Sequence, residues 1–257
     1  MIQEERMTDI LNILKKRKKI SNDELASILY CSPSTLRRDL IKLENQKLIR
    51  RVVGGSVLNI ASTNEPSFYY RETNQIPEKK MICELAKDFI GDGMCIFVDS
   101  SSTVQQLIPL LETVSNLVIL TNGLRVALSI SDMNDESIKA FLIGGEIKRN
   151  SSSVVGTDFS KSFTEQFNID LAIFSCRGID QKGVYEASLS QAQIKQNFLK
   201  TAQKSILLVD DTKFDSTHFF KVADLDKFSN VITNKKPDDS YLETFEEKGI
   251  ECFYEDK

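Results

Sequence analysis

The apolar residues at the start of the chain follow the spacing of a helix. They recur at i, i+3, i+4 and i+7, which places them on one helix face, and the basic run from Lys15 to Lys19 closes the segment. These apolar residues are Met7, Ile10, Leu11 and Leu14. A second, short helix is predicted after Ser21, because Ser21 and Glu24 match a capping box, in which each side chain bonds the backbone N–H of the other residue.

A third helix is predicted after a tight turn. Ser32 suits its N-cap, and Pro33 fits the first turn, where the missing N–H has no helical partner to lose. The inner face carries Leu36, Leu40 and Leu43, while the remaining surface is polar and basic. A short helix, a tight turn and a basic helix are typical of a helix-turn-helix, whose second helix enters the DNA major groove by its N-terminal end.

The next segment, 48–58, has the pattern of two short strands around a Gly-Gly turn. A hairpin directly after a recognition helix is a wing. Its arginines are expected to contact phosphates or the minor groove, and its glycines to let the tip approach the DNA backbone closely. The residues predicted to bind double-stranded operator DNA are Ser32, Ser34, Thr35, Arg37, Arg38, Lys42, Arg50, Arg51, Gly54 and Gly55.

Charge is distributed unevenly along the chain. Residues 1–58 hold 12 Lys or Arg against 7 Asp or Glu, a net charge of +5, whereas the remaining residues hold 21 against 30, a net charge of −9. A basic first domain joined to an acidic second one indicates that only the first meets a polyanion.

The cysteines and the hydropathy indicate the cellular compartment and the kinds of site to expect. The 5 cysteines are scattered, with no CxxC pair, so we expect neither a metal site, a redox centre nor a cofactor, and we interpret them as small buried hydrophobes in a reducing compartment. No apolar run approaches the ~18 residues of a membrane span, and the N-terminus does not resemble a signal peptide. A cytoplasmic protein that contacts no membrane is expected.

The segment 59–76 is expected to link two domains. It lacks sustained periodicity, is rich in Ser, Thr, Asn and Pro, and contains the aromatic group Phe68, Tyr69 and Tyr70. The predicted organisation is a winged helix-turn-helix over 1–58, this linker, and a domain for effector sensing and oligomerisation over 77–257. The aromatic residues suggest that the linker docks on the larger domain.

Short apolar runs alternate with helical segments throughout 77–257, which predicts an α/β domain with an open, mostly parallel sheet. Val104–Leu111 and Gln191–Ala202 have helical spacing. The expected strands are Met94–Val98, Leu117–Leu120, Ile138–Ile143, Leu171–Phe174, Ile206–Val209, Val231–Ile232 and Ile250–Tyr254.

Small and polar residues follow five of these strands. In an open α/β sheet the carboxyl ends of the strands share one edge, where ligands bind, and a Ser/Thr-rich turn before a helix offers N–H groups and hydroxyls to a phosphate. Lys213 suits the phosphate, and Asp99 and Asp210 suit sugar hydroxyls. The predicted effector site consists of Asp99, Ser100, Ser101, Ser102, Thr103, Thr121, Asn122, Gly123, Gly144, Gly145, Arg177, Asp210 and Lys213.

The first domain carries a specific motif. Residues 32–40 read Ser-Pro-Ser-Thr-Leu-Arg-Arg-Asp-Leu, followed by Leu43-Glu44 and, at 51–56, by Arg-Val-Val-Gly-Gly-Ser. This resembles the DeoR family of bacterial sugar-operon repressors, which usually has His at the position of Val53 and Ala at that of Ser56. Both departures are expected at the wing tip.

The resemblance continues through the larger domain, in the turns that begin at Asp99, Thr121, Gly144 and Asp210. It implies a sugar-phosphate effector and a fold similar to ribose-phosphate and glucosamine-phosphate isomerases. Ser101 stands where the family usually has Gly, and its side chain is expected to narrow the approach to a phosphate.

Two other functions fit parts of the pattern. The second domain could be a sugar-phosphate isomerase in which Asp99, Glu186 or Asp210 moves protons, although an isomerase needs no DNA-binding domain and the chain's 1 histidine, His218, lies outside the strand-end loops. The winged helix could instead bind a protein, although Thr35, Arg37 and Arg38 stand where DNA would lie. We therefore expect a non-enzymatic, homo-oligomeric repressor whose effector changes the spacing of its DNA-binding domains.

Overall fold

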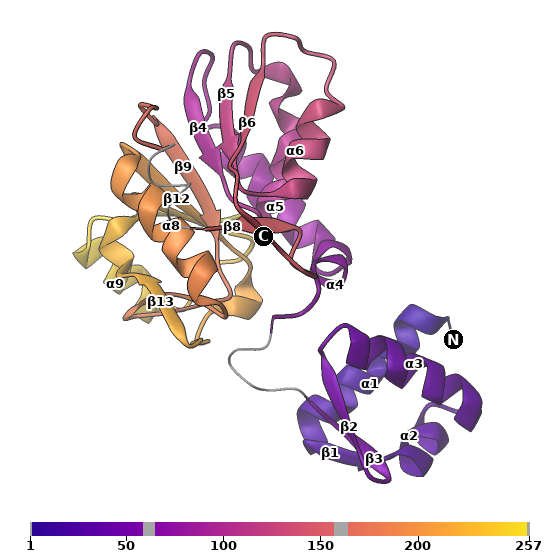
Figure 1. Ribbon diagram of the computed structural model, residues 1–257. Helices are drawn as coiled ribbons and strands as arrows, with labels where there is room; N and C mark the ends of the chain where they lie inside the picture. The colour runs from indigo at the N-terminus through magenta and orange to yellow at the C-terminus, as the bar shows by residue number, and fades with distance from the viewer. Residues whose placement is uncertain (1, 59–64, 157–163, 256–257) are drawn as a thin grey trace. The chain divides into compact units, whose positions relative to one another are not determined.

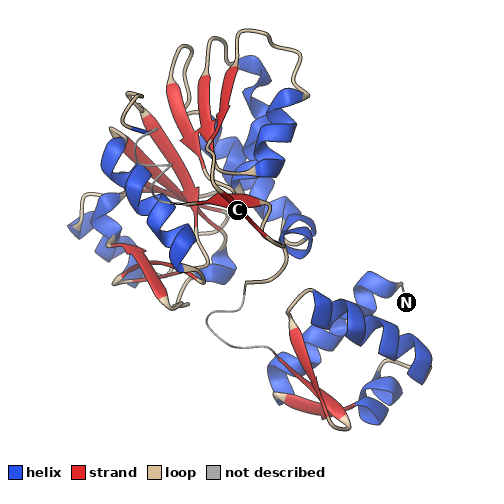
Figure 2. Cartoon of the chain, viewed as in Figure 1, coloured by secondary structure: helices blue, strands red, loops and turns tan. Residues whose placement is uncertain are grey.

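The protein consists of two compact units in a computed structural model that describes residues 2–58, 65–156 and 164–255. We call Met1–Tyr70 the head and Arg71–Lys257 the body. Both units mix helices and strands, as Figures 1 and 2 show. Each unit has hydrophobic clusters of its own and is described separately.

The head is a winged helix-turn-helix. Its helices pack around one core of eleven buried apolar residues, which include Leu36, Leu40 and Leu43 of the third helix. The elements in chain order are α1 (Gln3–Arg17), β1 (Lys19–Ser21), α2 (Asn22–Ile28), α3 (Pro33–Asn45), β2 (Ile49–Val52) and β3 (Gly55–Leu58). The three predicted helices and the wing are confirmed, and β1 is an addition that extends the wing to the sheet order β1-β3-β2.

The predicted caps account for the helix starts. The Ser21 hydroxyl accepts a hydrogen bond from the Glu24 N–H at 3.2 Å, and Ser32 does the same for Thr35 at 3.2 Å. The Glu24 carboxylate, expected to complete a capping box, accepts a hydrogen bond from Arg17 of α1. That contact ties α2 to the end of α1.

A buried ion pair joins the first and third helices. Asp39 is fully buried on α3, and its carboxylate accepts hydrogen bonds from Arg6 Nε at 2.6 Å and from Gln3 Nε2 at 2.8 Å. The hydrogen bond to Asp39 raises the pKa of Arg6. Asp39 therefore sets how α3 sits on α1, and its place in the Arg-Arg-Asp-Leu motif has a structural explanation.

The two wing glycines have different roles. Gly54 has φ +73° and open space around it, so it serves the turn. Gly55 is buried, and a Cβ there would lie 2.3 Å from the carbonyl oxygen of Ile20 in β1. Ser56 is likewise buried opposite Ile20, so the expectation that it lies at the wing tip is wrong, whereas Val53 is fully exposed there.

The expected linker is partly helical. Its residues 59–64 lie outside the described residues, and α4 (Phe68–Thr73) follows. The Ser67 N–H donates to the carbonyl of Gln46 at 3.3 Å, and Tyr70 packs against the core of the head. The expectation that these aromatics dock on the larger domain is therefore wrong for Tyr70, whose side chain is part of the apolar packing of the head.

The body is built on a parallel sheet of seven strands in the order β15-β14-β12-β9-β4-β5-β6. All seven predicted strands are confirmed. They are β4 (Cys95–Val98), β5 (Val118–Thr121), β6 (Lys139–Leu142), β9 (Leu171–Ser175), β12 (Lys204–Val209), β14 (Asn230–Thr233) and β15 (Glu251–Phe253). All pairings between these seven strands are parallel, and the five inner strands are apolar runs because both of their faces are buried.

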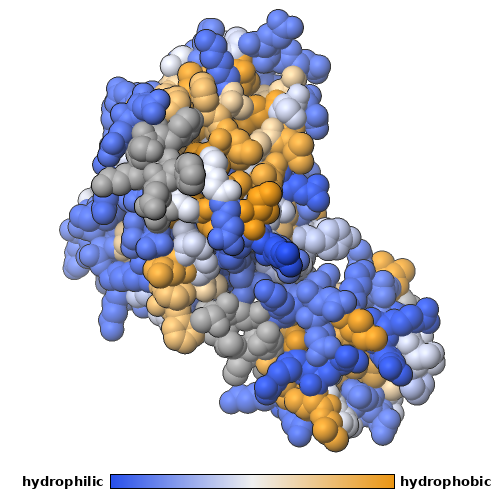
Figure 3. Space-filling model, viewed as in Figure 1, coloured by the Kyte–Doolittle hydropathy of each residue, from blue (hydrophilic) through white to orange (hydrophobic). Residues whose placement is uncertain are grey.

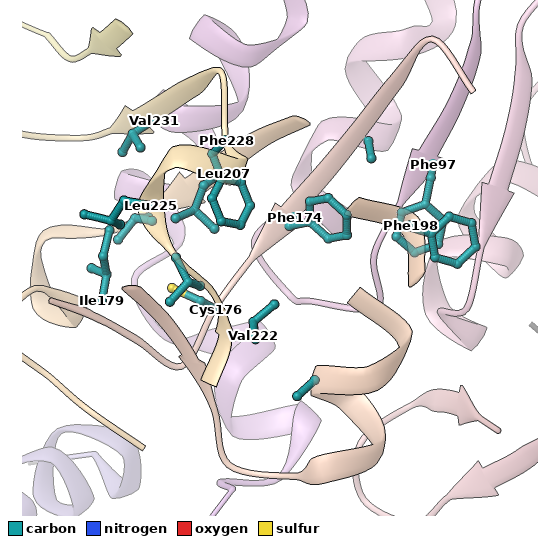
Figure 4. Packing of buried hydrophobic residues seen from close by; sticks show 14 of the residues in the cluster. Phe97, Phe174, Cys176, Ile179, Phe198, Leu207, Val222, Leu225, Phe228 and Val231 are labelled. Atoms are coloured by element: carbon teal, nitrogen blue, oxygen red, sulfur yellow. The ribbon is translucent and has the colours of Figure 1, made fainter. Parts of the chain in front are cut away.

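Alternate residues of these strands face two separate cores. On one side, Phe97 stacks on Phe198 with ring centroids 3.5 Å apart and packs near Phe174 (Figure 4). On the other side, Ile96 and Val98 meet helices that precede and follow β4. The helical segments of the body are α5 (Ile76–Lys87), the 3₁₀ helix η1 (Val104–Thr113), α6 (Leu124–Ser131), α8 (Leu189–Thr201), η2 (Asp211–Lys213), η3 (Leu225–Lys227) and α9 (Asp239–Glu247).

Five short antiparallel strands were not predicted. The first two form a hairpin after β6, and the other three form a small sheet after β9. They are β7 (Glu146–Lys148), β8 (Ser153–Val155), β10 (Gly178–Asp180), β11 (Gly183–Glu186) and β13 (Phe220–Ala223). At three or four residues each, they are too short to show an alternating pattern in the sequence.

Replacing Gly55 by Ala should destabilise the head, because the new methyl group overlaps the Ile20 carbonyl. We expect a loss of about 1–3 kcal/mol, measured by calorimetric unfolding of the full chain. Gly54→Asn is the matched control, since Asn tolerates a positive φ and meets open space. A normal unfolding temperature for Gly55→Ala combined with weaker DNA binding would instead indicate that Gly55 contacts DNA.

Candidate functional sites

The front of α3 presents polar and basic side chains to solvent. Ser32, Ser34, Arg37 and Arg38 are exposed, and Thr35 is half-buried. The Ser32 hydroxyl lies 3.0 Å from that of Ser34 and 2.9 Å from that of Thr35, so this helix start is held rigid. The two arginines follow directly, and their guanidinium groups suit phosphates and guanine edges.

The other predicted DNA-binding residues differ in whether they already bind another residue of the head. Lys42 is half-buried and donates to Gln3 Oε1 at 3.3 Å. On the wing, Arg50 is exposed, whereas Arg51 binds Glu44 of α3 through its Nε at 2.6 Å and its backbone N–H at 3.1 Å. The hydrogen bonds from Arg51 lower the pKa of Glu44. Arg51 therefore fastens the wing to the recognition helix.

The turn after β4 lies at the carboxyl edge of the sheet and is largely buried. Asp99 is 1% exposed, and its two carboxylate oxygens accept hydrogen bonds from the N–H groups of Ser101 at 2.8 Å and Ser175 at 3.0 Å. The Ser101 hydroxyl accepts a hydrogen bond from the Val104 N–H at 3.1 Å. Ser101, which stands where a glycine was expected, thus caps η1.

Lys195 of α8 forms a buried ion cluster with this turn. Its ammonium lies 2.9 Å from Asp99 Oδ2 and 2.5 Å from Glu186 Oε1, and it donates to the carbonyl of Ser175. Burial opposes the charge on Lys195, but the two carboxylates outweigh it and raise its pKa. Asp99 is therefore engaged on both oxygens by the protein itself.

The turn after β12 brings a second lysine to the same edge. Lys213 donates to the Ser175 hydroxyl at 3.1 Å and lies 3.4 Å from Asp210 Oδ2. Burial of Asp210 works against its charge, but Lys213, the Thr212 hydroxyl and Lys79 together lower its pKa. The Thr212 hydroxyl also donates to Asp210. Ser175 of β9 consequently links the turn at Asp99 to the turn at Asp210.

Two further cations lie at this edge. Lys79 of α5 is 4% exposed and donates to the Ser102 hydroxyl at 3.2 Å. Burial and the neighbouring Lys213 lower the pKa of Lys79 to about 8, and Arg177 adds to this. The Arg177 Nε is buried and has no hydrogen-bond partner among the described residues. Three positive groups thus converge at the ends of β9, β12 and the turn after β4.

The remaining predicted effector residues fall into two groups. Thr121, Asn122 and Gly123 are buried beside the first turn, since a Cβ on Gly123 would lie 3.0 Å from the Cα of Ser100. Asn122 donates to the carbonyl of Val154 at 3.1 Å, and its own Oδ1 is buried without a partner in the described residues. The strands therefore bring these residues to the turn at Asp99.

Gly144 and Gly145 have a different environment. Both are exposed at the entrance to the β7–β8 hairpin. Gly145 has φ +147°, and a Cβ there would lie 2.4 Å from the carbonyl of Val155. This glycine lets the hairpin close, and within the described residues no hydrogen bond joins it to the cations at the sheet edge.

Lys79 and Lys195 were missed by the sequence analysis. Both stand on the apolar face of a helix: Lys79 one turn before Ile82 and Cys83, and Lys195 between Ile194 and Phe198. A lysine on an inward helix face is the signal that could have identified them, because an unpaired buried ammonium is strongly disfavoured.

Within residues 2–58, 65–156 and 164–255, no group of His, Cys, Asp and Glu side chains could hold a metal ion. In the same part of the chain, every helix is too short or too polar to cross a membrane.

Both units match known domain families. The DeoR-like helix-turn-helix domain matches residues 6–61, and the DeoR C terminal sensor domain matches residues 74–235, more than half of the chain.

Full-length relatives are repressors. The chain is 30% identical over 251 residues to the HTH-type transcriptional repressor GlcR of Bacillus subtilis, covering 98% of this chain and 96% of that protein. It is 29% identical over 252 residues to the glycerol-3-phosphate regulon repressor of Escherichia coli, covering 98% of both. It is also 29% identical over 247 residues to the lactose phosphotransferase system repressor of Staphylococcus aureus, covering 95% of this chain and 96% of that protein.

Solved structures show weaker likenesses. Ribose 5-phosphate isomerase from Plasmodium falciparum has a TM-score of 0.39 and 14% identity, covering 54% of this chain and 52% of that one. The translation initiation factor eIF-2B of Pyrococcus horikoshii has a TM-score of 0.44 and 11% identity, covering 88% of this chain and 82% of that one.

Replacing Lys195 by Met should destabilise the body, because Asp99 and Glu186 would lose their shared counter-charge inside the protein. We expect a loss of about 3–5 kcal/mol, measured by urea unfolding. Lys200→Met on the exposed side of the same helix is the control and should change stability by less than about 0.5 kcal/mol. Equal stability of the two variants would contradict the role of Lys195 in holding this edge together.

Proposed function

The chain belongs to the DeoR family, and we propose that it represses a sugar-metabolism operon and that a phosphorylated sugar, bound at the carboxyl edge of the sheet, controls its affinity for operator DNA. Its head is a DNA-binding helix-turn-helix domain and its body a sensor domain. A protein that acts on chromosomal DNA works in the cytoplasm, which is the location we propose.

The convergence of Lys79, Arg177 and Lys213 is the observation that carries the effector proposal. Lys195 is balanced by two carboxylates and Lys213 by Asp210. Lys79 donates only to oxygens of carbonyls and a hydroxyl, and Arg177 Nε has no partner among the described residues. The edge therefore has surplus positive charge, which suits a phosphate dianion.

The hydrogen bonds refine the predicted effector residues. We propose that Ser100, Ser102, Thr103 and the cations bind the phosphate, while Asp99 shapes the turn because both of its oxygens are already occupied. Asn122, with its buried Oδ1 unpaired within the described residues, is the better candidate to recognise a sugar hydroxyl.

The isomerase alternative is disfavoured. The relatives named above are transcription regulators rather than enzymes. Asp99 and Glu186, two of the carboxylates that would have to move protons, are held by Lys195 instead of being open to a substrate. We therefore propose a sensor without turnover.

A second copy of the chain is the proposed partner of an apolar face of the body. The sheet ends at β6, whose residues 139–142 are all exposed. Phe141, Leu142, Leu128 of α6 and Ile147 of β7 are large exposed hydrophobics, and Figure 3 shows hydrophobic residues gathered on the face that carries these elements. Two identical edge strands can pair about a twofold axis, which matches a repeated operator.

Fluorescence anisotropy on duplex DNA from upstream of the chain's own gene tests the head. We expect tight binding that falls steeply with salt, and a loss of about 1–3 kcal/mol for Arg38→Ala, because its guanidinium faces solvent at the front of α3. Arg50→Ala should lower the salt slope by about 1. Binding that ignores salt and both substitutions would favour a protein partner for the winged helix.

Adding sugars to the same complex tests the body. We expect one phosphorylated sugar to release the DNA while its unphosphorylated counterpart does not, since the surplus charge recognises the phosphate. Lys213→Ala should weaken this response about tenfold or more, the loss of one charge-assisted hydrogen bond. Release by unphosphorylated sugars alone, or turnover of the sugar phosphate into an isomer, would contradict the proposal.

Sedimentation velocity tests the oligomer. We expect an assembly larger than one chain, and Leu142→Lys should shift it towards the monomer, because a charge would be buried in the apolar contact. Phe219→Lys, at an exposed hydrophobic outside this face, is the control. An unchanged assembly in Leu142→Lys would place the interface elsewhere.

A further inference from the structure

Lys79 occupies an unusual position for a lysine. It lies in the first turn of α5, is 4% exposed, and forms no ion pair with a carboxylate of the described residues. Lysines are rarely this buried, and the ammonium of a buried lysine is paired with other groups. Its hydrogen bonds therefore indicate what the ammonium is for.

Two of these hydrogen bonds cap α4. The ammonium donates to the carbonyl of Arg71 and, at 2.6 Å, to that of Asn74. α4 ends at Thr73, so these are among the terminal carbonyls that a helix leaves without internal partners. A helix of six residues is marginal on its own, which makes its stability dependent on such a cap.

The third hydrogen bond reaches the effector turn. The same ammonium donates to the hydroxyl of Ser102 at 3.2 Å, in the turn proposed to bind phosphate. Lys213, Asp210, Arg71 and Arg177 are the charged groups that act on Lys79. A phosphate dianion entering this turn would attract the ammonium more strongly than neutral carbonyls do, because charge-assisted hydrogen bonds are about twice as strong as neutral ones.

α4 continues in the chain into the head. Phe68, Tyr69 and Tyr70 form its first half and belong to the head, and Tyr70 packs against the head core. Its second half begins at Arg71, which belongs to the body. The capped C-terminal end of α4 is therefore separated from the head by only a few residues of the chain.

We infer that Lys79 binds the phosphoryl group of the effector and caps α4 when that group is absent. Binding at the sensor site therefore changes the stability of the helix that leads to the head. This inference rests on the sugar-phosphate site proposed above. Effector binding draws the ammonium from the carbonyls of Arg71 and Asn74 towards the turn at Ser102. α4 then loses its cap and frays, which loosens the connection between body and head.

Hydrogen exchange of the full-length wild-type protein tests the coupling directly. Inorganic phosphate and glucose 6-phosphate are the probes, since both carry the group that Lys79 is inferred to bind. We expect amide exchange in residues 68–76 to become about tenfold faster with a probe that binds, within the usual range of coupling between sites. Unchanged exchange there, while a probe binds by calorimetry, would overturn the inference without requiring any variant.

Variants of Lys79 test the same link through DNA binding. Lys79→Met keeps the apolar stem and removes the ammonium, so residues 68–76 should exchange fast without any probe and DNA affinity should fall about tenfold, with no further response to phosphate. Lys79→Arg retains a cationic donor and should retain part of the response. Lys80→Met, the next and exposed residue of α5, is the matched control and should behave as wild type.

The outcomes separate this inference from the function on which it rests. If no phosphorylated sugar binds or releases wild-type DNA complexes, the effector proposal fails. If one does, and Lys79→Met responds with the same midpoint and amplitude as wild type, the effector proposal stands and the role of Lys79 is refuted.

Discussion

The carboxyl edge of the parallel sheet depends on one buried ion cluster. Lys195 is the shared counter-charge of Asp99 and Glu186 inside the body, and Asp99 in turn accepts hydrogen bonds from the N–H groups of Ser101 and Ser175. Without that counter-charge, two carboxylates would be buried unpaired, which costs several kcal/mol in a low-dielectric interior. The turn after β4 keeps its shape because this cluster holds the Asp99 carboxylate in place.

The rest of the sensor edge follows from that arrangement. Asp99 and Asp210 are committed to lysines, and Asp99 also to backbone N–H groups, whereas Lys79 and the Arg177 Nε form no ion pair with a carboxylate among the described residues. These two cations are the basis of the anion site that we propose. The same electrostatic logic operates in the head, where Asp39 binds Arg6 and Glu44 binds Arg51. There the acidic residues place α3 and the wing, and Arg37, Arg38 and Arg50 stay exposed, as the proposed binding of DNA requires.

Much of this was predictable from local pattern. The helical spacing, the Ser21 and Ser32 caps and the Gly-Gly turn define the winged helix, because each depends on residues close together in sequence. The parallel strands were equally evident, since the five inner ones are buried on both faces and must be continuously apolar. Polar turns at their carboxyl ends predicted a ligand site at one edge of the sheet, because parallel strands bring those ends together.

By itself, then, the sequence determined the two folds and predicted a surface for DNA and a sheet edge for a ligand, because all of these depend on short-range periodicity and strand direction. Only the tertiary structure decided which polar residues remain free to bind. Asp99 and Arg51 are committed to partners 96 and 7 positions away. Gly55 lets its backbone approach the Ile20 carbonyl closely. Lys79 and Lys195 reach the edge from helices with no motif of their own. Burial makes such pairings obligatory, and burial is decided by which distant segments pack together.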